Sequence, residues 1–325
     1  MRIAGLDLLR GLAIGLVMLR HAAPDLAPGA GVVGVVMFFT LSGYLITGLL
    51  HDELEQTGRV DLRRFYVRRA RRLVPALLFL VAGVVVVTLL LDPLGDREEL
   101  GKTVLVALTW TGNLPFGHAS DATFHLWTLA TEEQFYLVWP ALLAVAFAAR
   151  RTGLALGLAA ATCLAACVAT VVWLREAPDL AYSLPTTWAL CFVVGAAARL
   201  HGTRLDPRWA MAALPALGVL SMLPLRGQSV TYLLGGPAIA VLTAVLLLAW
   251  RGLVTVENVA LRALVWLGTV SYAAYLWNYP LTLWLRPHLG VAAGVTAAAG
   301  TLVLAALSRR YVEQPVRSRP KVLVA

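Results

Sequence analysis

The sequence predicts an all-α fold, a transmembrane helical bundle of about ten spanning helices with both termini in the cytoplasm. The 325-residue chain is 59% hydrophobic and only 14% charged, whereas a soluble domain carries about 25% charged residues. Its mean hydropathy is +0.76, and apolar runs long enough to cross a lipid bilayer recur along it. The composition excludes a soluble globular protein, and we predict one transmembrane domain over residues 1–325 in the inner (plasma) membrane.

Ten apolar runs have roughly the 20 residues that a helix needs to cross the hydrocarbon core. They lie at 6–23, 30–50, 73–91, 127–148, 153–174, 183–199, 209–225, 231–250, 263–286 and 291–308. A further stretch at 100–116 is weaker, because Thr, Gly, Asn and Pro interrupt it. We expect that stretch to be a re-entrant or interfacial segment and not an additional span.

The charged residues set the expected topology, because basic residues stay on the cytoplasmic side of a membrane protein. Basic clusters occur at 59–72, 150–151, 199–208, 251 and 309–321. Ten crossings place all of these clusters inside and leave the acidic stretch at 92–99 outside. The net charge of +9 is then a consequence of topology, and it does not imply a nucleic-acid partner.

The first apolar run contains ionisable side chains, among them Arg10 and His21. Charge is costly in hydrocarbon, so such groups are candidates for a functional role. The two residues are eleven positions apart, which is close to three helical turns, and they should project from one face about 16 Å apart along the axis. The alternative is that they lie at opposite interfaces and extend to water. The residues alone leave both interpretations open.

A basic loop, DLRRFYVRRARRLVP, follows the second run and contains Arg68, Arg69 and Arg72. Arg69 and Arg72 are one turn apart at the start of the next expected helix, and an i, i+3 pair can grip a phosphate from two sides. The phosphate of a nucleotide or coenzyme arriving from the cytoplasm suits such a clamp. The alternative is a topology-setting loop held by anionic lipid headgroups.

Three further residues are candidates for lining a substrate pocket. Ser42 stands beside Gly43 in the middle of the second run, where a ligand or simply another helix can approach closely. Ser42 lacks the strand-to-helix turn that exposes a nucleophilic serine, so we do not expect an acyl-enzyme serine. Tyr275 and Asn278 belong to a polar, aromatic strip within the run at 263–286, and we expect this strip to line an acceptor cavity.

Glu132 stands near the start of the apolar run at 127–148. A carboxylate in that position can orient an imidazole or accept a proton, and the alternative is a cap at the membrane interface. The cysteines, Cys163, Cys167 and Cys191, lie inside apolar runs at spacings that match no metal site. We interpret them as small buried hydrophobic residues and predict no metal.

Taken together, six strings of the sequence resemble the acyltransferase-3 family of integral-membrane acyltransferases. The strings run in order between residues 5 and 317: GLDLLRG, FFTLSGYLI, FYVRRARRLVP, HLWTLATEEQFYLVWP, LGTVSYAAYLWNYP and RRYVEQPVR. The resemblance implies ten transmembrane helices. It also implies transfer of an acyl group, most often acetyl, from acyl-CoA to a hydroxyl.

The resemblance also implies roles for individual residues. His21 matches the catalytic histidine, and Arg10 matches its essential partner on the same helix. Arg69 and Arg72 match the paired arginines linked to donor handling, with Arg68 beside them. Glu132 matches the acidic residue of the family's WSL-x-x-E segment, which here reads WTLATE.

The sequence departs from the family pattern at Asn278, where the family usually has His. Asn can donate and accept hydrogen bonds, but it cannot carry a proton at neutral pH. We therefore expect Asn278 to line the acceptor pocket, and the change is consistent with a different acceptor.

The expected function is O-acylation, with acyl-CoA as donor and a hydroxyl-bearing carbohydrate of the cell envelope as acceptor. A second possibility is acylation of a small-molecule acceptor, a secondary metabolite such as a macrolide. A third, from another class, is a transporter in which Arg10, His21 and Glu132 couple transport to protons.

Overall fold

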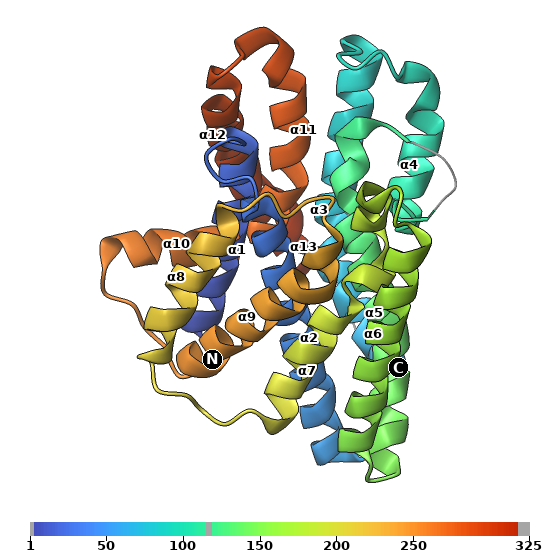
Figure 1. Ribbon diagram of the computed structural model, residues 1–325. Helices are drawn as coiled ribbons and strands as arrows, with labels where there is room; N and C mark the ends of the chain where they lie inside the picture. The colour runs from blue at the N-terminus through green and yellow to red at the C-terminus, as the bar shows by residue number, and fades with distance from the viewer. Residues whose placement is uncertain (1–2, 115–118, 318–325) are drawn as a thin grey trace. The chain divides into compact units, whose positions relative to one another are not determined.

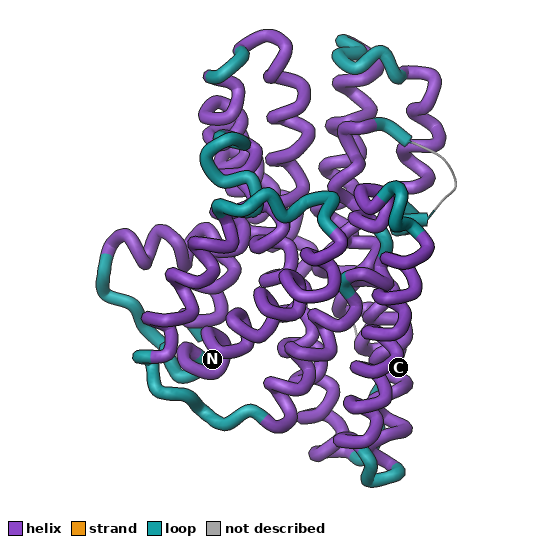
Figure 2. Tube along the Cα trace, in the orientation of Figure 1, coloured by secondary structure: helices purple, strands orange, loops and turns teal. Residues whose placement is uncertain are grey.

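The computed structural model describes residues 3–114 and 119–317. Within these residues every regular element is a helix, and no strand occurs (Figure 2). This confirms the predicted all-α class. The chain divides into two compact units, and each unit combines two separate parts of the sequence. The first unit comprises Met1–Val60 and Trp127–Thr269, and the second comprises Asp61–Leu126 and Val270–Ala325.

The first unit contains most of the helices (Figure 1). They are α1 (Ala4–Ala22), α2 (Ala30–Thr57), α5 (Trp127–Ala148), α6 (Thr152–Trp173), α7 (Ala189–His201), α8 (Trp209–Ser221), α9 (Gly236–Trp250) and α10 (Val259–Thr269). Short elements η3 (Pro178–Ser183), η4 (Pro185–Thr187) and η5 (Thr231–Gly235) precede α7 and α9. The most extensive packing joins α2 to α7 and α1 to α10.

Glycines bring these paired helices into close contact. Gly43 of α2 faces the backbone of Phe192 on α7, and Gly195 of α7 faces the carbonyl of Thr40 on α2. In the other pair, Gly268 of α10 faces the carbonyl of Asp7 on α1. Small residues let helix backbones approach in a membrane, where dispersion contacts replace the hydrophobic effect as the force that joins helices.

We expect Gly43→Ala to destabilise the first unit. A Cβ added at Gly43 would lie 2.7 Å from the carbonyl carbon of Phe192, so α2 and α7 would have to separate. Overpacking of this kind costs about 1–3 kcal/mol, and thermal unfolding in detergent should occur several degrees lower. Gly157→Ala on α6 is the matched control, because a Cβ there meets no atom within 4 Å. Equal melting temperatures for the two variants would contradict this account of the α2–α7 contact.

The second unit contains the remaining helices (Figure 1). They are α3 (Leu62–Leu90), η1 (Arg97–Glu99), α4 (Leu100–Thr109), η2 (Asp121–Leu126), α11 (Ser271–Leu289), α12 (Ala292–Leu307), η6 (Ser308–Glu313) and α13 (Gln314–Arg317). Helix α11 packs extensively on α12 and also contacts η2. Its Trp277 lies on Gly83 of α3, where a larger side chain would collide with the indole ring.

Membrane-crossing helices are present, as the composition predicts. Among the described residues, five helices are long and apolar enough to span a bilayer, or six if the consecutive helices α10 and α11 form one span. The predicted count of ten spans and the cytoplasmic termini stay predictions. Helix α4 has ten residues and a length of about 15 Å, half of the hydrocarbon core, which is compatible with a re-entrant or interfacial segment at 100–116.

One expected helix is divided in the structure. The sequence predicts a single span over 263–286, whereas α10 ends at Thr269 and α11 begins at Ser271. The break follows Gly268, and glycine, threonine and valine are weak helix formers. The Thr269 hydroxyl also donates to the carbonyl of Trp266 at 2.7 Å, a local bond that competes with helix continuation.

Candidate active site

Helix α1 carries a buried ion pair at its start. Arg10 Nη1 donates to Asp7 Oδ1 at 3.1 Å, and the Asp7 side chain is only 3% exposed while that of Arg10 is 20% exposed. The i, i+3 spacing places both groups on one face of the helix. The Asp7 carboxylate fixes the guanidinium of Arg10, so this arginine is held in one position along α1.

His21 lies in the last turn of the same helix and is half-buried. Because α1 is continuous from Ala4 to Ala22, the predicted relation between Arg10 and His21 holds, with an axial separation of about 16 Å. The helix ends one residue later, and Ala23 donates its backbone N–H to the carbonyl of Leu19. The imidazole therefore lies at a helix end, and its catalytic role stays a prediction.

The structure joins Ser42 and Glu132, two residues that the sequence analysis singles out separately. Ser42 Oγ on α2 donates to Glu132 Oε1 on α5 at 3.1 Å. Tyr136, one turn along α5, donates its hydroxyl to Glu132 Oε2 at 2.9 Å. Both carboxylate oxygens are thus engaged, and hydrogen bonds to a carboxylate are stronger than those between neutral groups.

Packing around this triad of Ser42, Glu132 and Tyr136 is dense. Trp139 on α5 donates its indole N–H to Thr47 on α2 at 2.8 Å, a second polar bond between the same two helices. The ring of Phe192 on α7 stacks on Phe39 and Phe135, with centroids 4.7 and 4.6 Å away. The carboxylate of Glu132 therefore has a fixed orientation, which a group that positions an imidazole or accepts a proton requires.

Tyr136 was not singled out from the sequence, although a signal was present. It follows Glu132 by four residues in a run predicted to be helical, and residues at i and i+4 are neighbours on a helix surface. The side chain of Tyr136 is 2% exposed, so it packs in the core in addition to donating a hydrogen bond to the carboxylate.

The three arginines of the basic loop lie in the second unit. Asp61 begins α3 by accepting a hydrogen bond from the backbone N–H of Arg64 at 2.9 Å. Arg68, Arg69 and Arg72 consequently lie inside α3, which begins at Leu62 and contains Pro75. The prediction of a basic loop before an apolar run at 73–91 is therefore wrong for this segment, because the Asp61 cap starts the helix eleven residues before that run. Arg68 and Arg72 are exposed, and Arg69 is half-buried. Arg69 and Arg72 share a helix face, so both can contact the same anion.

Tyr275 and Asn278 also lie in the second unit, and both make contacts between helices. Asn278 is 1% exposed, and its Nδ2 donates to Thr301 on α12 at 3.2 Å. The Tyr275 hydroxyl donates to the carbonyl of His125 at 3.0 Å. In this structure Asn278 thus links α11 to α12, and its role in lining an acceptor pocket stays a prediction.

His125 is a buried histidine that connects η2 to α11. Its Nε2 lies 3.0 Å from the carbonyl oxygen of Leu276, and its ring lies between those of Tyr275 and Tyr279, at 5.5 and 5.2 Å. These contacts fix the ring within the second unit.

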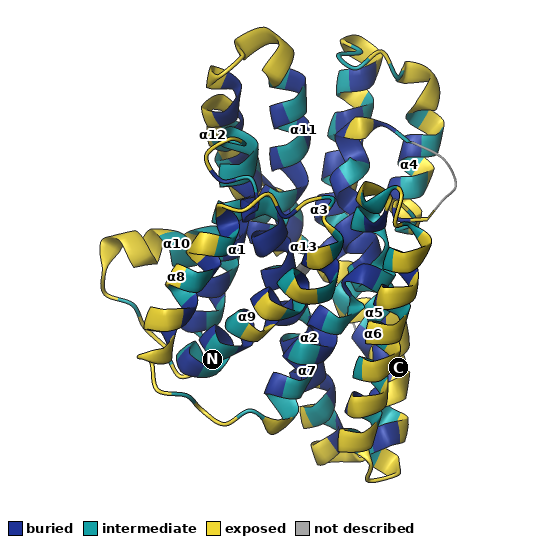
Figure 3. Cartoon of the chain, viewed as in Figure 1, coloured by how far each residue is buried: buried dark blue, intermediate teal, exposed yellow. Residues whose placement is uncertain are grey.

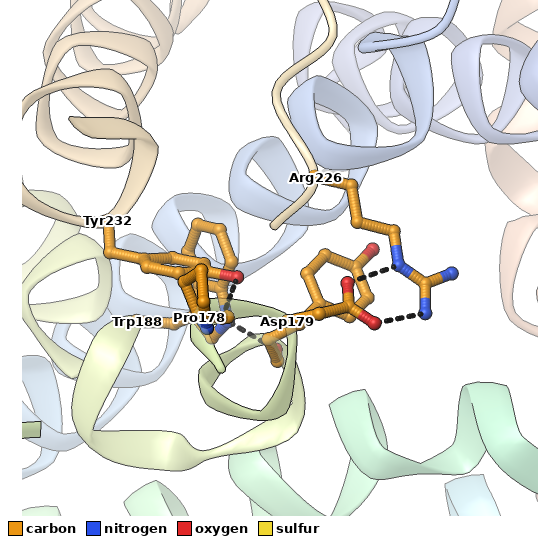
Figure 4. Close-up of polar contacts among 6 residues, drawn as sticks. Pro178, Asp179, Trp188, Arg226 and Tyr232 are labelled. Carbon is orange, nitrogen blue, oxygen red and sulfur yellow. Dashed lines mark hydrogen bonds and ion pairs between the residues drawn. The ribbon is translucent and has the colours of Figure 1, made fainter. Parts of the chain in front are cut away.

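A polar and aromatic cluster surrounds η3 in the first unit, and the sequence analysis singled out none of its residues (Figure 4). Arg226 Nε donates to Asp179 Oδ1 at 3.1 Å and the guanidinium stands 4.9 Å from the ring centre of Tyr182. Tyr232 donates to the carbonyl of Pro178 at 3.0 Å. The cluster ties η3 to the segment between α8 and α9.

The predicted site residues therefore fall into two groups. Arg10, His21, Ser42 and Glu132 belong to the first unit, and the arginines together with Tyr275 and Asn278 belong to the second. Among the residues that the structure describes, no three His, Cys, Asp or Glu side chains are grouped as metal ligands.

Known proteins resemble the chain along almost its whole length. It is 29% identical to the peptidoglycan O-acetyltransferase OatA of Listeria monocytogenes, over 97% of this chain and 56% of the relative. It is 31% identical to the putative peptidoglycan O-acetyltransferase YrhL of Bacillus subtilis, over 98% of this chain and 55% of the relative. It is 26% identical to the O-acetyltransferase OatA of Staphylococcus aureus, over 97% of this chain and 57% of the relative.

The chain thus spans a little over half the length of these relatives. No solved structure matches it. The profile of a family described as an acyltransferase domain matches residues 3–308, which include every predicted site residue. The protein therefore belongs to the acyltransferase-3 family.

Proposed function

We propose that this protein is a plasma-membrane O-acetyltransferase that moves an acetyl group from acetyl-CoA to a hydroxyl of a cell-envelope carbohydrate, with peptidoglycan as the first candidate. The observation that carries the proposal is the match over 97% and 98% of this chain to relatives named as peptidoglycan O-acetyltransferases. The fixed carboxylate of Glu132 within an apolar helix agrees with a catalytic site inside this domain.

The donor would be recognised by the basic start of α3. Arg69 and Arg72 share a helix face, and guanidinium groups bind phosphate through paired hydrogen bonds. The phosphates of coenzyme A carry negative charge that complements these guanidinium groups. Arg68, exposed on the same turn, adds positive charge that attracts the donor from the cytoplasm.

The proposed chemistry begins at His21. A neutral imidazole takes the proton from the acceptor hydroxyl, and the hydroxyl oxygen attacks the thioester carbonyl of the donor. The carbon–sulfur bond then breaks, the acetyl group stays on the acceptor oxygen, and the leaving thiolate takes the proton back from the imidazolium. Hydrogen-bond donors around the carbonyl stabilise the transient oxyanion. Attack by His21 itself, through an acetyl-imidazole, is the competing sequence of steps.

We assign supporting roles in this step to Arg10 and Glu132. Arg10 is held by Asp7, so its positive charge is fixed, and it serves either to stabilise the donor or to set the local electrostatic field. Glu132 is held by Ser42 and Tyr136, and it serves to orient the imidazole or to accept a proton.

The acceptor is tested by comparing cells with and without the gene. Mass spectrometry of muropeptides and of exported metabolites should detect an additional acetyl ester on the peptidoglycan sugars of cells that express the protein. If only an exported metabolite were acetylated, the acceptor would instead be a secondary metabolite such as a macrolide. Proton-dependent solute uptake without any acetyl ester would instead identify a transporter.

A further inference from the structure

An apolar groove of about 920 Å³ runs between α5, α6 and α7 in the first unit. This volume is within the range of roughly 300–1,000 Å³ that is typical of ligand sites. We refer to it as the α5–α6–α7 groove, and the apolar side chains that line it include Val138, Leu142, Val145, Leu154, Leu158 and Phe192. Between these side chains the wall is made of alanines, among them Ala155 and Ala159, which leave room for a flexible chain.

The groove opens on a surface that would face lipid. Helix α6 is long and apolar enough to span a membrane, and only 11% of its most apolar stretch is buried inside the protein. Exposed residues recur along this helix (Figure 3). On the two sides of the groove, Val145 is 70% exposed and Leu158 is 60% exposed. In a bilayer these side chains contact acyl chains and not water.

One end of the groove carries a positive charge. Arg151 is the one charged side chain among the described residues that line it. A tight turn between α5 and α6 places it there: Arg150 adopts a left-handed backbone with φ of 56°, and Arg151 donates its backbone N–H to the carbonyl of Ala146 at 2.9 Å. Basic residues at a helix end favour the cytoplasmic side of the membrane.

The length of the groove along α6 matches the thickness of one leaflet of a bilayer. The lining residues of α6 extend from Leu154 to Cys163, which are nine positions apart and therefore span about 14 Å of helix. Half of the hydrocarbon core is about 15 Å thick. A lipid whose headgroup lies at Arg151 would thus have acyl chains of suitable length to follow α6.

We infer that the α5–α6–α7 groove binds an anionic phospholipid of the inner leaflet, with its phosphate at Arg151 and an acyl chain between α5 and α6. Charge complementarity selects the headgroup, and the apolar, alanine-lined wall accommodates the chain. The inference uses none of the residues assigned to acetyl transfer, so it stands or fails independently of the proposed function.

The test compares two lipids with identical acyl chains, phosphatidylglycerol and phosphatidylcholine, by native mass spectrometry of the whole protein released from detergent micelles. The unmodified protein should retain phosphatidylglycerol in preference to phosphatidylcholine. Arg151→Gln should weaken phosphatidylglycerol binding about fivefold and leave phosphatidylcholine unchanged. Arg150→Gln is the matched control, because the neighbouring arginine does not line the groove, and it should bind both lipids normally.

A second variant tests the apolar part of the site. Ala159→Trp fills the groove and should reduce binding of both lipids, and Ala155→Leu serves the same purpose if the tryptophan variant does not fold. Equal retention of the two lipids by the unmodified protein, or the same lipid affinity in Arg151→Gln and Arg150→Gln, would overturn the inference. So would a lipid-free dimer that Ala159→Trp dissociates, since the occupant would then be a second copy of the chain.

Discussion

Replacing His21 with alanine should reduce acetyl transfer by a factor of about 10²–10⁴, the usual contribution of a general base. The acceptor hydroxyl would lose the group that removes its proton, while the half-buried position at the end of α1 means that folding should be little affected. The measurement is the initial rate of label transfer from acetyl-CoA in membranes that contain equal amounts of each protein.

Arg20→Gln is the matched control for this experiment. Arg20 is the preceding residue in the same last turn of α1 and is also half-buried, but no role in the reaction is assigned to it. A rate within about twofold of the unmodified protein is expected, because Gln keeps a polar side chain of similar length and the reaction does not use this residue. If His21→Ala and Arg20→Gln reduce the rate equally, the loss reflects damage to the end of the helix and not to the chemistry.

Glu132→Gln should have the second largest effect, a loss of about 10²-fold or more in kcat. The amide keeps the size of the side chain but removes the negative charge, and its nitrogen cannot accept the hydrogen bond that one carboxylate oxygen now receives from Ser42 or Tyr136. The KM for acetyl-CoA should change little, because the donor phosphates are assigned to other residues. Rates at varied acetyl-CoA concentration separate the two parameters.

Two further variants on α5 show whether the effect belongs to the Glu132 carboxylate. Tyr136→Phe removes one of the two hydrogen bonds to the carboxylate and should cost about fivefold in rate, the value of one such bond. Glu133→Gln removes the adjacent carboxylate and should leave the rate nearly unchanged. If Glu133→Gln reduced the rate as much as Glu132→Gln, the loss would reflect the negative charge at this helix end in general and not the Glu132 carboxylate in particular.

The helical architecture follows from the sequence because the apolar runs are long and their boundaries carry charge. Each of the ten runs overlaps at least one helix of the structure, and the continuous α1 places Arg10 and His21 on one helix as expected. The break between α10 and α11 at Gly268–Val270 was not predicted, because a hydrophobic run does not indicate where helix propensity falls within it.

The triad of Ser42, Glu132 and Tyr136 shows what sequence reasoning cannot supply. Ser42 and Glu132 are separated by 90 positions, and no periodicity within either run indicates that their side chains meet. Their contact depends on how α2, α5 and α7 pack, and that packing rests on glycines such as Gly43 and on stacked aromatic rings. The i, i+4 relation of Glu132 and Tyr136, by contrast, is readable from the sequence.

Asn278 illustrates a different limit. The resemblance to the family drew attention to it as a departure, but only the structure reveals its hydrogen bond to Thr301. An amide suits this bond because it can donate without carrying a charge into the apolar contact between α11 and α12.

The most direct test of the account is the transfer of radiolabel from acetyl-CoA to envelope glycan in isolated membranes, with the unmodified protein and His21→Ala at equal abundance. The account predicts labelled, base-labile acetyl ester on the glycan with the unmodified protein and almost none with the variant. Label that reaches the glycan equally well with an alanine in place of the imidazole would contradict it.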